Sequence, residues 1–162
     1  MAIYMNFNDK KPFGDVTALG YEQWIEIDNF NFGVARGISM QAGALGNREN
    51  SRPSITEINF SKSLDAASAG LFKGSVTGDE GVTVEIHIVQ TGATQVEKFA
   101  TFTMNDCIIS SYSISASAGG PPSENVSISF SKIEGDLSYA DKSNAISANM
   151  IVGYDLSTAT SY

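Results

Sequence analysis

Cysteine, histidine and positive charge are all scarce in this chain of 162 residues. Cys107 is the only cysteine, which excludes an intramolecular disulfide and the zinc sites that are built from paired cysteines. Ten Lys and Arg residues against 18 Asp and Glu residues give a net charge of −8, which disfavours binding to DNA, RNA or anionic lipid. We therefore expect no nucleic-acid partner and no insertion into a membrane.

Long apolar runs are absent as well. No stretch approaches the roughly 18 consecutive apolar residues of a membrane span. The N-terminus also lacks the basic start and apolar run of a signal peptide. We expect a soluble protein that is made in the cytoplasm, so any exit from the cell would use a route other than a signal peptide.

Groups that could perform catalysis are few. His87, the only histidine, lies on the polar face of an alternating segment, which predicts a surface histidine. Cys107 stands between two apolar segments, as small core residues do, and the alternative is a reactive thiol beside Asp106. Asp79 and Glu80 fall in a turn, where we expect solvent around them. The chain has no G-x-S-x-G, G-x-G-x-x-G or P-loop motif, so we predict no catalysis, metal or cofactor.

Apolar and polar residues alternate in many segments, which is the pattern of half-buried strands. Turns rich in Gly and Ser separate these segments. The pattern predicts one mainly β domain over residues 1–162, an antiparallel barrel or sandwich of about eight strands with one short α-helix. The expected strands are residues 2–7, 21–32, 58–60, 82–89, 96–104, 108–114, 126–130 and 148–156.

The connections between these strands are also predicted from composition. Residues 91–94 form a hairpin turn, and residues 115–122 form a loop rich in Gly and Pro. Residues 136–144 are expected to be a polar connection. Ile133 breaks the alternation that precedes it, which indicates a β-bulge.

One segment changes from the period of a strand to the period of a helix. Leu71, Phe72 and Val76 fall on one helical stripe, which predicts that all three are buried. Ser68 is the candidate N-cap of this helix. Gly78 can adopt the left-handed conformation that ends a helix.

The segment Gly33–Pro53, which we call the arm, has no sustained period. It is rich in glycine and contains Arg36, Arg48 and Arg52. Loops of this length without regular structure are uncommon in compact domains unless they have a function. The arm is therefore the first place to look for a partner, and the alternative is a mobile surface loop.

The segment just before the arm has apolar or aromatic side chains on both faces. Ile25 and Ile27 lie on one face of the expected strand, whereas Trp24 and Phe32 lie on the other. We therefore expect this strand to be covered on both sides.

Five groups of residues, in chain order, carry a resemblance to a known family. They are Ile25-Glu26-Ile27 with Asn31-Phe32-Gly33-Val34, Phe60-Ser61-Lys62 with Leu64-Asp65 and Ala67-Ser68, Ile108-Ile109-Ser110-Ser111 with Gly119-Gly120, Ser123 to Phe130, and Gly153-Tyr154-Asp155-Leu156. Together they resemble the haemolysin-coregulated protein (Hcp) family, the tube subunit of type VI secretion systems. Residues 9–20 and 34–52 match the family only loosely, and Ala69 and Gly70 stand where it often has proline and lysine.

The resemblance implies a small antiparallel barrel that assembles head-to-tail into hexameric rings, which stack into a tube. It also implies sheath proteins around the tube, a spike protein at its tip and secreted effectors in its lumen. Under this hypothesis Arg36, Arg48 and Arg52 meet acidic groups of a neighbouring subunit or ring. The aromatic face with Trp24 and Phe32 would belong to a second contact surface.

Two other functions remain open from the residues alone. One is a monomeric small β-barrel that binds a ligand or a peptide. The other is a secreted hydrolase on a β scaffold, for which no catalytic set can be assembled. Mass in solution separates a ring from either monomer.

Overall fold

The computed structural model describes residues 1–38, 52–91, 96–140 and 146–162. Strands dominate this part of the chain, as predicted, and all their pairings in it are antiparallel. The elements are β1 Ala2–Phe7, β2 Ile25–Glu26, β3 Asn29–Asn31, β4 Val34–Ala35, β5 Ser54–Ile55, β6 Ile58–Ser63, α1 Ser68–Thr77, β7 Val82–Thr91, β8 Val96–Ser115, β9 Ser123–Ser129, β10 Lys132–Ala140, β11 Ile146–Asp155 and β12 Thr160–Ser161.

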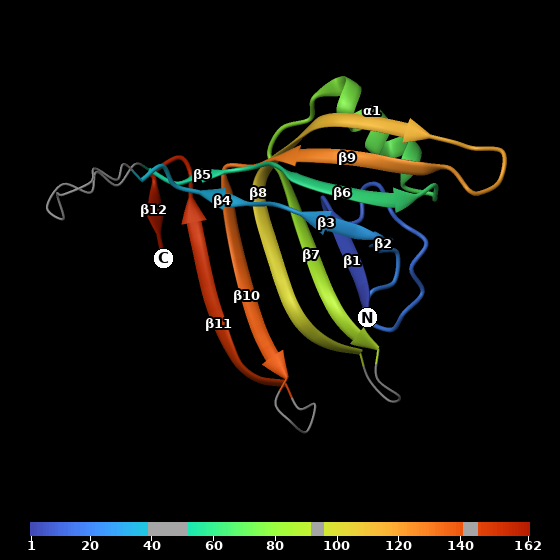
Figure 1. Cartoon of the computed structure of the whole chain (residues 1–162). Coiled ribbons are helices and arrows are strands. Elements are labelled where there is room, and N and C mark those ends of the chain that lie inside the picture. Colours follow the sequence, from blue (N-terminus) through green and yellow to red (C-terminus); the bar gives the residue numbers. More distant parts are fainter. Residues whose placement is uncertain (39–51, 92–95, 141–145) are drawn as a thin grey trace, which may run out of the picture.

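The strands form two layers that share the long strand β8 (Figure 1). One layer has the order β12-β11-β10-β8-β7-β1-β2, and the other contains β3, β6 and β9, with β9 pairing to the second half of β8. The short ribbon β4-β5 pairs separately. Apolar side chains from both layers meet between them, including Met5, Phe60, Ile86, Met104 and Ile128, each at most 2% exposed.

The strand β8 replaces the two strands that were predicted over residues 96–104 and 108–114. Asp106 has a φ of 52°, in the left-handed region, which lets the chain bend while its neighbours stay paired, Asn105 to Lys132 and Cys107 to Val82. The hydroxyl of Ser131 donates to Asp106 Oδ2 at 2.7 Å. A single bent strand therefore passes from one layer to the other. Cys107 is 1% exposed, so its prediction as a core residue is confirmed.

The segment predicted as one strand over residues 21–32 is divided between the layers. The N–H of Ile27 donates to Ile3 O in the first layer, and the N–H of Asp28 donates to Ser61 O in the second. The chain thus crosses from β1 to β6 between two consecutive residues. This crossing closes the side of the core formed by β2 and β3.

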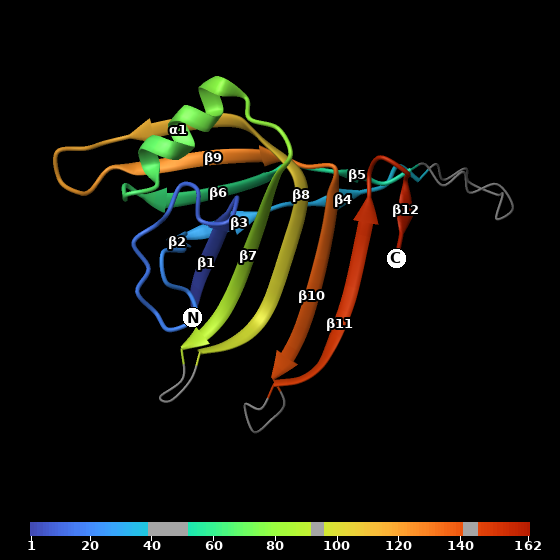
Figure 2. The same ribbon diagram turned by 180° about the vertical axis from the view of Figure 1, so that it is seen from behind.

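The helix α1 packs against β8 and begins and ends close to its predicted limits (Figure 2). As predicted, Gly78 ends it in the left-handed conformation, with a φ of 66°. Its N–H donates to Gly74 O. Two predictions about α1 are wrong. Its N-cap is Ala67 without a side-chain bond, and Phe72 and Val76 are 56% and 72% exposed.

The reason lies in which helical stripe faces the sheet. Ala67 and Leu71 are fully buried, and Gly74 follows on the same stripe. A Cβ on Gly74 would lie 3.3 Å from a methyl group of Ile109, and a Cβ on Gly70 would lie 2.4 Å from Pro12. The glycines therefore let the helix approach closely, and the larger side chains beside them point outward.

The C-terminal part differs from the sequence prediction in one element. Residues 132–140 form β10, whereas residues 136–144 were predicted to be a polar connection; residues 141–145 lie outside the described ranges. Ile133 is an ordinary buried residue of β10, and the irregular register falls instead between Ser138 and Tyr139. The polar side chains misled the prediction because β10 is paired on both sides, by β8 and β11, and backbone pairing outweighs composition there.

Candidate assembly surface

The residues predicted to make contacts fall into three places. Phe32, Arg36 and Arg52 line a single hollow. Trp24 lies elsewhere, in the core. Arg48 lies outside the described residues.

The hollow has a volume of about 510 Å³, and we call it the arginine hollow. It lies at the base of the arm, where β4 and β5 run beside the β10-β11 end of the larger sheet (Figure 1). Its lining is Phe32, Val34, Arg36, Arg52, Pro53, Ile55, Phe102, Ile133, Gly135, Val152, Gly153, Tyr154, Ala159 and Ser161. Its lining side chains are thus mostly apolar, with two cationic ones among them.

Local pairing fixes the wall that bears the arginines. Val34 pairs with Ile55, and the backbones of Gly33 and Thr56 are joined by the N–H of Thr56 donating to Gly33 O at 2.8 Å. The hydroxyl of Thr56 accepts the N–H of Gly33 at 2.7 Å. These bonds hold the two ends of the arm together, and Arg36 and Arg52, which follow β4 and precede β5, both line the hollow.

The charge at the hollow is not balanced within the described part of the molecule. Arg36 and Arg52 are exposed, and neither forms an ion pair with a described carboxylate. The arm has three arginines against one glutamate, Glu49, for a local charge of +2 in a chain whose net charge is −8. A partner with an acidic group and an apolar side chain would match this surface.

The floor of the hollow is aromatic and continues onto an exposed sheet face. The ring of Phe102 meets the rings of Phe30 and Phe32 edge-on, with centroids 5.4 and 5.5 Å away. On the neighbouring strands Leu137 pairs directly with Met150, and these side chains are 39% and 61% exposed. The apolar face of the sheet thus stays open at its β10-β11 end.

A second exposed apolar surface lies on α1. Phe72 packs against Tyr112 of β8, with ring centroids 5.3 Å apart, and Val76 follows one helical turn later. Ile114, two residues after Tyr112 on β8, is 55% exposed. This surface contains no residue of the arginine hollow, so the subunit has two different apolar surfaces.

Trp24 belongs to a buried cluster with Tyr4 and Tyr21, and the ring of His87 contacts those of Tyr21 and Trp24. The segment before β2 covers the face of β7 that had been predicted to meet solvent, so His87 is 6% exposed and that prediction is wrong. Its Nδ1 lies 3.1 Å from the hydroxyl of Tyr21. Burial, with a smaller effect of the nearby charge of Lys98, lowers the pKa of His87 to about 4. Trp24 therefore anchors this segment to the core.

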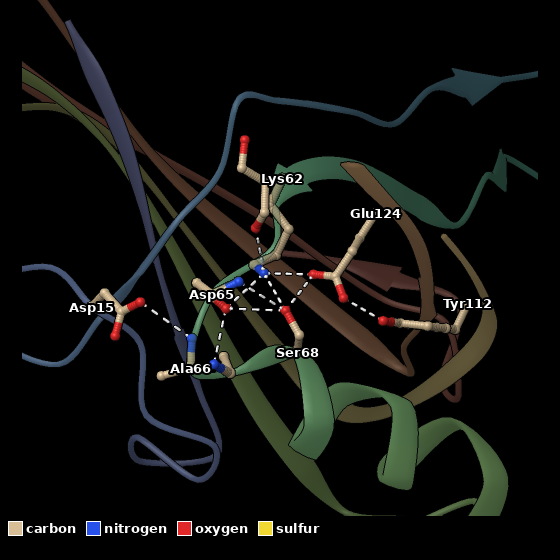
Figure 3. Close-up of polar contacts among 9 residues, drawn as sticks. Asp15, Lys62, Asp65, Ala66, Ser68, Tyr112 and Glu124 are labelled. Atoms are coloured by element: carbon tan, nitrogen blue, oxygen red, sulfur yellow. Dashed lines mark hydrogen bonds and ion pairs between the residues drawn. The ribbon is translucent and has the colours of Figure 1, made fainter. Parts of the chain in front are cut away.

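Sequence reasoning missed a buried ionic group that joins α1 to the second layer (Figure 3). This group, the Lys62 cluster, consists of Lys62, Asp65, Ser68, Tyr112 and Glu124. Lys62 Nζ lies 2.6 Å from Glu124 Oε2 and 2.7 Å from Asp65 Oδ1, and the side chains of Lys62 and Glu124 are fully buried. Ser68 Oγ donates to Glu124 Oε2 at 2.8 Å, and the hydroxyl of Tyr112 donates to Glu124 Oε1.

Hydrogen bonds within this cluster determine which of its groups are charged. Burial alone would raise the pKa of Glu124, but bonds from Lys62, Tyr112 and Ser68 outweigh that effect and lower it. Burial, and then the bond to Glu124, raises the pKa of Tyr112 to about 12. A carboxylate and an ammonium group thus hold the start of α1 against β6 and β9.

A signal for this pair is present in the sequence. Lys62 continues the inward face of Ile58 and Phe60, and Glu124 begins the inward face of Val126 and Ile128. Opposite charges on the inward faces of two strands indicate that they pair, and Lys62 is indeed directly opposite Glu124 in the β6-β9 register. Alternation, however, shows only which face of a strand each residue lies on. The register of β6 against β9 is needed to place Lys62 opposite Glu124.

Two further observations concern metals and membranes. In the described ranges no group of three or more His, Cys, Asp or Glu side chains is placed to hold a metal ion. No helix in the same ranges is both long and apolar enough to cross a membrane.

Solved structures with the same fold belong to type VI secretion. The chain is similar to a structure described as a type six secretion system protein, with a TM-score of 0.90, 22% identity and coverage of 99% of both chains. It is also similar to Hcp1 of Salmonella typhimurium, with a TM-score of 0.73, 21% identity and full coverage of both. A type VI secretion system effector from Yersinia pestis has a TM-score of 0.71 and 18% identity, covering 94% of this chain and 98% of that one.

These structural similarities establish the fold. A match between the sequence and a family model shows the family. No curated protein sequence matches the chain. The family model described as "Type VI secretion system effector, Hcp" matches residues 4–136, most of the chain. The matched range includes most of β1, all of β2 to β9, the apolar face of α1, part of the arginine hollow and the whole Lys62 cluster. The chain therefore belongs to the Hcp family, the tube proteins of type VI secretion systems.

Proposed function

We propose that residues 1–162 act as a single-domain tube subunit, which assembles head-to-tail into hexameric rings that stack into a tube. A head-to-tail ring needs two different complementary surfaces on each subunit. The observation that carries the proposal is that two separate apolar surfaces, the arginine hollow and the apolar face of α1, are open to contact with neighbouring subunits, and they need not be each other's partners. Both surfaces are exposed to solvent, whereas the apolar side chains between the two layers are buried.

The arm supplies the charged part of this proposal. Arg36, Arg48 and Arg52 contact acidic groups of a neighbouring subunit or ring, and Phe32 contributes to the apolar floor beside them. Trp24 takes no direct part, because it is 7% exposed. It contributes by holding the segment before β2 in place.

The remaining partners follow from the role of a tube. Sheath proteins surround the tube, a spike protein caps it and effectors occupy its lumen. The subunit is made in the bacterial cytoplasm and leaves through the type VI machine. The role is structural, so it uses no catalysis, metal or cofactor and involves neither nucleic acid nor membrane insertion.

Mass in solution tests this function. Static light scattering of the purified protein is expected to give roughly six times the 17.2 kDa of one chain. A mass of one chain at all concentrations would contradict the proposal. It would favour the alternative, a monomeric β-barrel whose ligand occupies the arginine hollow, since about 510 Å³ is the size of many small-molecule sites.

A further inference from the structure

The arginine hollow calls for an occupant with an exposed apolar side chain and a carboxylate on a rigid backbone. Its apolar lining favours the first, and the charges of Arg36 and Arg52, which pair with no described carboxylate, favour the second. Rigidity matters because ordering a loose loop costs free energy on binding. A turn in the described part of the chain has all three properties.

That turn comprises residues 18–22, and we call it the Leu19 turn. Leu19 is 87% exposed, the highest value among the large hydrophobic side chains in the described part of the chain. The carboxylate of Glu22 lies beside it, accepting the N–H of Gly20 at 3.1 Å. An apolar tip and an acid are therefore presented together.

Backbone bonds and buried rings keep the Leu19 turn in place. The N–H of Tyr21 donates to Ala18 O at 2.9 Å, and the N–H of Gln23 donates to Val16 O at 2.8 Å. Tyr21 and Trp24 are 5% and 7% exposed and fasten the turn to the aromatic cluster around His87. Leu19 is thus held out into solvent by a well-packed base.

Charge and position both match the hollow. Residues 14–28 contain four acidic residues, Asp15, Glu22, Glu26 and Asp28, and no Lys or Arg, for a local charge of −4 against +2 in the arm. The segment between β1 and β2, which carries the turn, lies at the opposite end of the subunit from β4, β5 and β12 in both ribbon views (Figures 1 and 2). The turn therefore lies far from its own hollow, whereas a head-to-tail neighbour could present it.

We propose that, in the ring, the arginine hollow of one subunit receives Leu19 of the next copy, with Glu22 of that copy pairing with Arg36 and Arg52. This inference rests on the proposed function, because it requires a ring. It adds the identity of the segment that fills the hollow. It also gives the two ends of the subunit opposite charge, which specifies the direction of head-to-tail contact.

A disulfide cross-link tests the contact directly. In a Cys107→Ala background, Leu19→Cys and Val34→Cys are combined in one chain, because Val34 is 60% exposed and lines the hollow. Mild oxidation is expected to give a ladder of covalent multimers on a non-reducing gel, since a disulfide needs Cα atoms within about 7 Å. The matched control pairs Val34→Cys with Phe72→Cys, which is 56% exposed on α1 and is expected to give no ladder.

Charge reversal tests the ionic part. Arg36→Glu/Arg52→Glu and Glu22→Lys are each expected to raise the concentration at which rings half-dissociate, measured by sedimentation velocity, about tenfold or more. Combining all three changes is expected to recover most of that loss. Glu80→Lys, a reversal in the exposed turn after α1 and near Val76, is the control and is expected to give no recovery.

The outcomes separate this inference from the proposed function. Rings of the expected mass without a ladder above the control, or recovery by Glu80→Lys in place of Glu22→Lys, would overturn the Leu19 contact and leave the ring intact. A wild-type protein with the mass of one chain would overturn both. A ladder in the 19–34 pair together with recovery by Glu22→Lys supports the contact.

Discussion

The Lys62 cluster and the arginine hollow both place positive charge beside apolar side chains. They differ in whether carboxylates of the same subunit neutralise that charge. Lys62 is fully buried and meets two carboxylates, a hydroxyl and a backbone carbonyl. Arg36 and Arg52 are exposed and pair with no described carboxylate. A charge that is balanced inside the subunit fixes its fold, whereas a charge left at an open apolar surface is available to a partner.

The largest effect is expected where the internal balance is broken. Lys62→Met leaves Glu124 and Asp65 without their cation, and removing one partner of a buried ion pair costs about 3–5 kcal/mol. Urea denaturation followed by circular dichroism measures this loss in the free energy of unfolding. Lys62→Met/Glu124→Leu is the matched control and is expected to be less destabilised, because the uncompensated charge of Glu124 is gone. A loss below about 1 kcal/mol for Lys62→Met would mean that the cluster does not hold the fold.

The two sides of α1 offer a similar contrast between apolar side chains, one buried inside the subunit and one exposed at its surface. Leu71→Ala removes a fully buried side chain and is expected to lower the free energy of unfolding by about 2–5 kcal/mol. Phe72→Asp, one residue away and 56% exposed, is expected to cost less than about 1 kcal/mol while preventing ring formation. Denaturation and light scattering measure the two effects. Soluble, unaltered rings from Phe72→Asp would remove this face of α1 from the assembly.

Burial of His87 in the aromatic cluster is expected to make the stability of the fold sensitive to acid. The pKa of His87 is about 4 in the folded protein, below its ordinary value of 6.5, so the unfolded chain binds the proton more readily. The contribution of neutral His87 to the free energy of unfolding is complete above about pH 6.5. It is lost as the pH falls toward 4, on the order of 3 kcal/mol in total. Glu124, whose pKa is lowered from 4.5, loses its contribution only at lower pH.

Urea denaturation between pH 7 and pH 4.5 measures this dependence. His87→Gln serves as the control, since it cannot take up the proton and is expected to show a flatter profile. Equal slopes for the two proteins in that interval would contradict the buried, neutral state of His87.

The smallest effect on folding is expected at the arm. Deleting residues 40–50, which lie outside the described ranges, is expected to change the free energy of unfolding by about 0.5 kcal/mol or less, because shortening a loop changes its closure entropy only slightly. The same deletion is expected to give poorly stacking rings, which electron microscopy can assess. Normal tubes from this deletion would contradict a role of the arm in stacking.

Local pattern was sufficient for the class of fold and for much of the core. In the expected strands over residues 2–7, 82–89 and 126–130, alternation puts Met5, Val84 and Ile128 on the apolar face, and all three are fully buried. Gly78 was recognised as the end of the helix because its left-handed conformation is a local property. The family could also be identified, since it depends on short groups of residues in order along the chain.

The errors share a physical cause, which is that alternation assigns a residue to a face but does not say what covers that face. His87 was expected in solvent because only the fold lays residues 14–24 across its strand. Phe72 was expected in the core because the close approach of Gly70 to Pro12 and of Gly74 to Ile109 selects a different helical stripe.

The arginine hollow and the Lys62 cluster depend on tertiary structure in the same way. The residues of each come from distant parts of the chain, and antiparallel register brings them together, as it does for Lys62 and Glu124. The sequence was sufficient to show that arginines gather in the arm and that charges occur on inward strand faces. Only the pairing of the strands decided that the first group stays open to a partner and the second is balanced within the subunit, because burial and charge balance depend on neighbours far away in the chain.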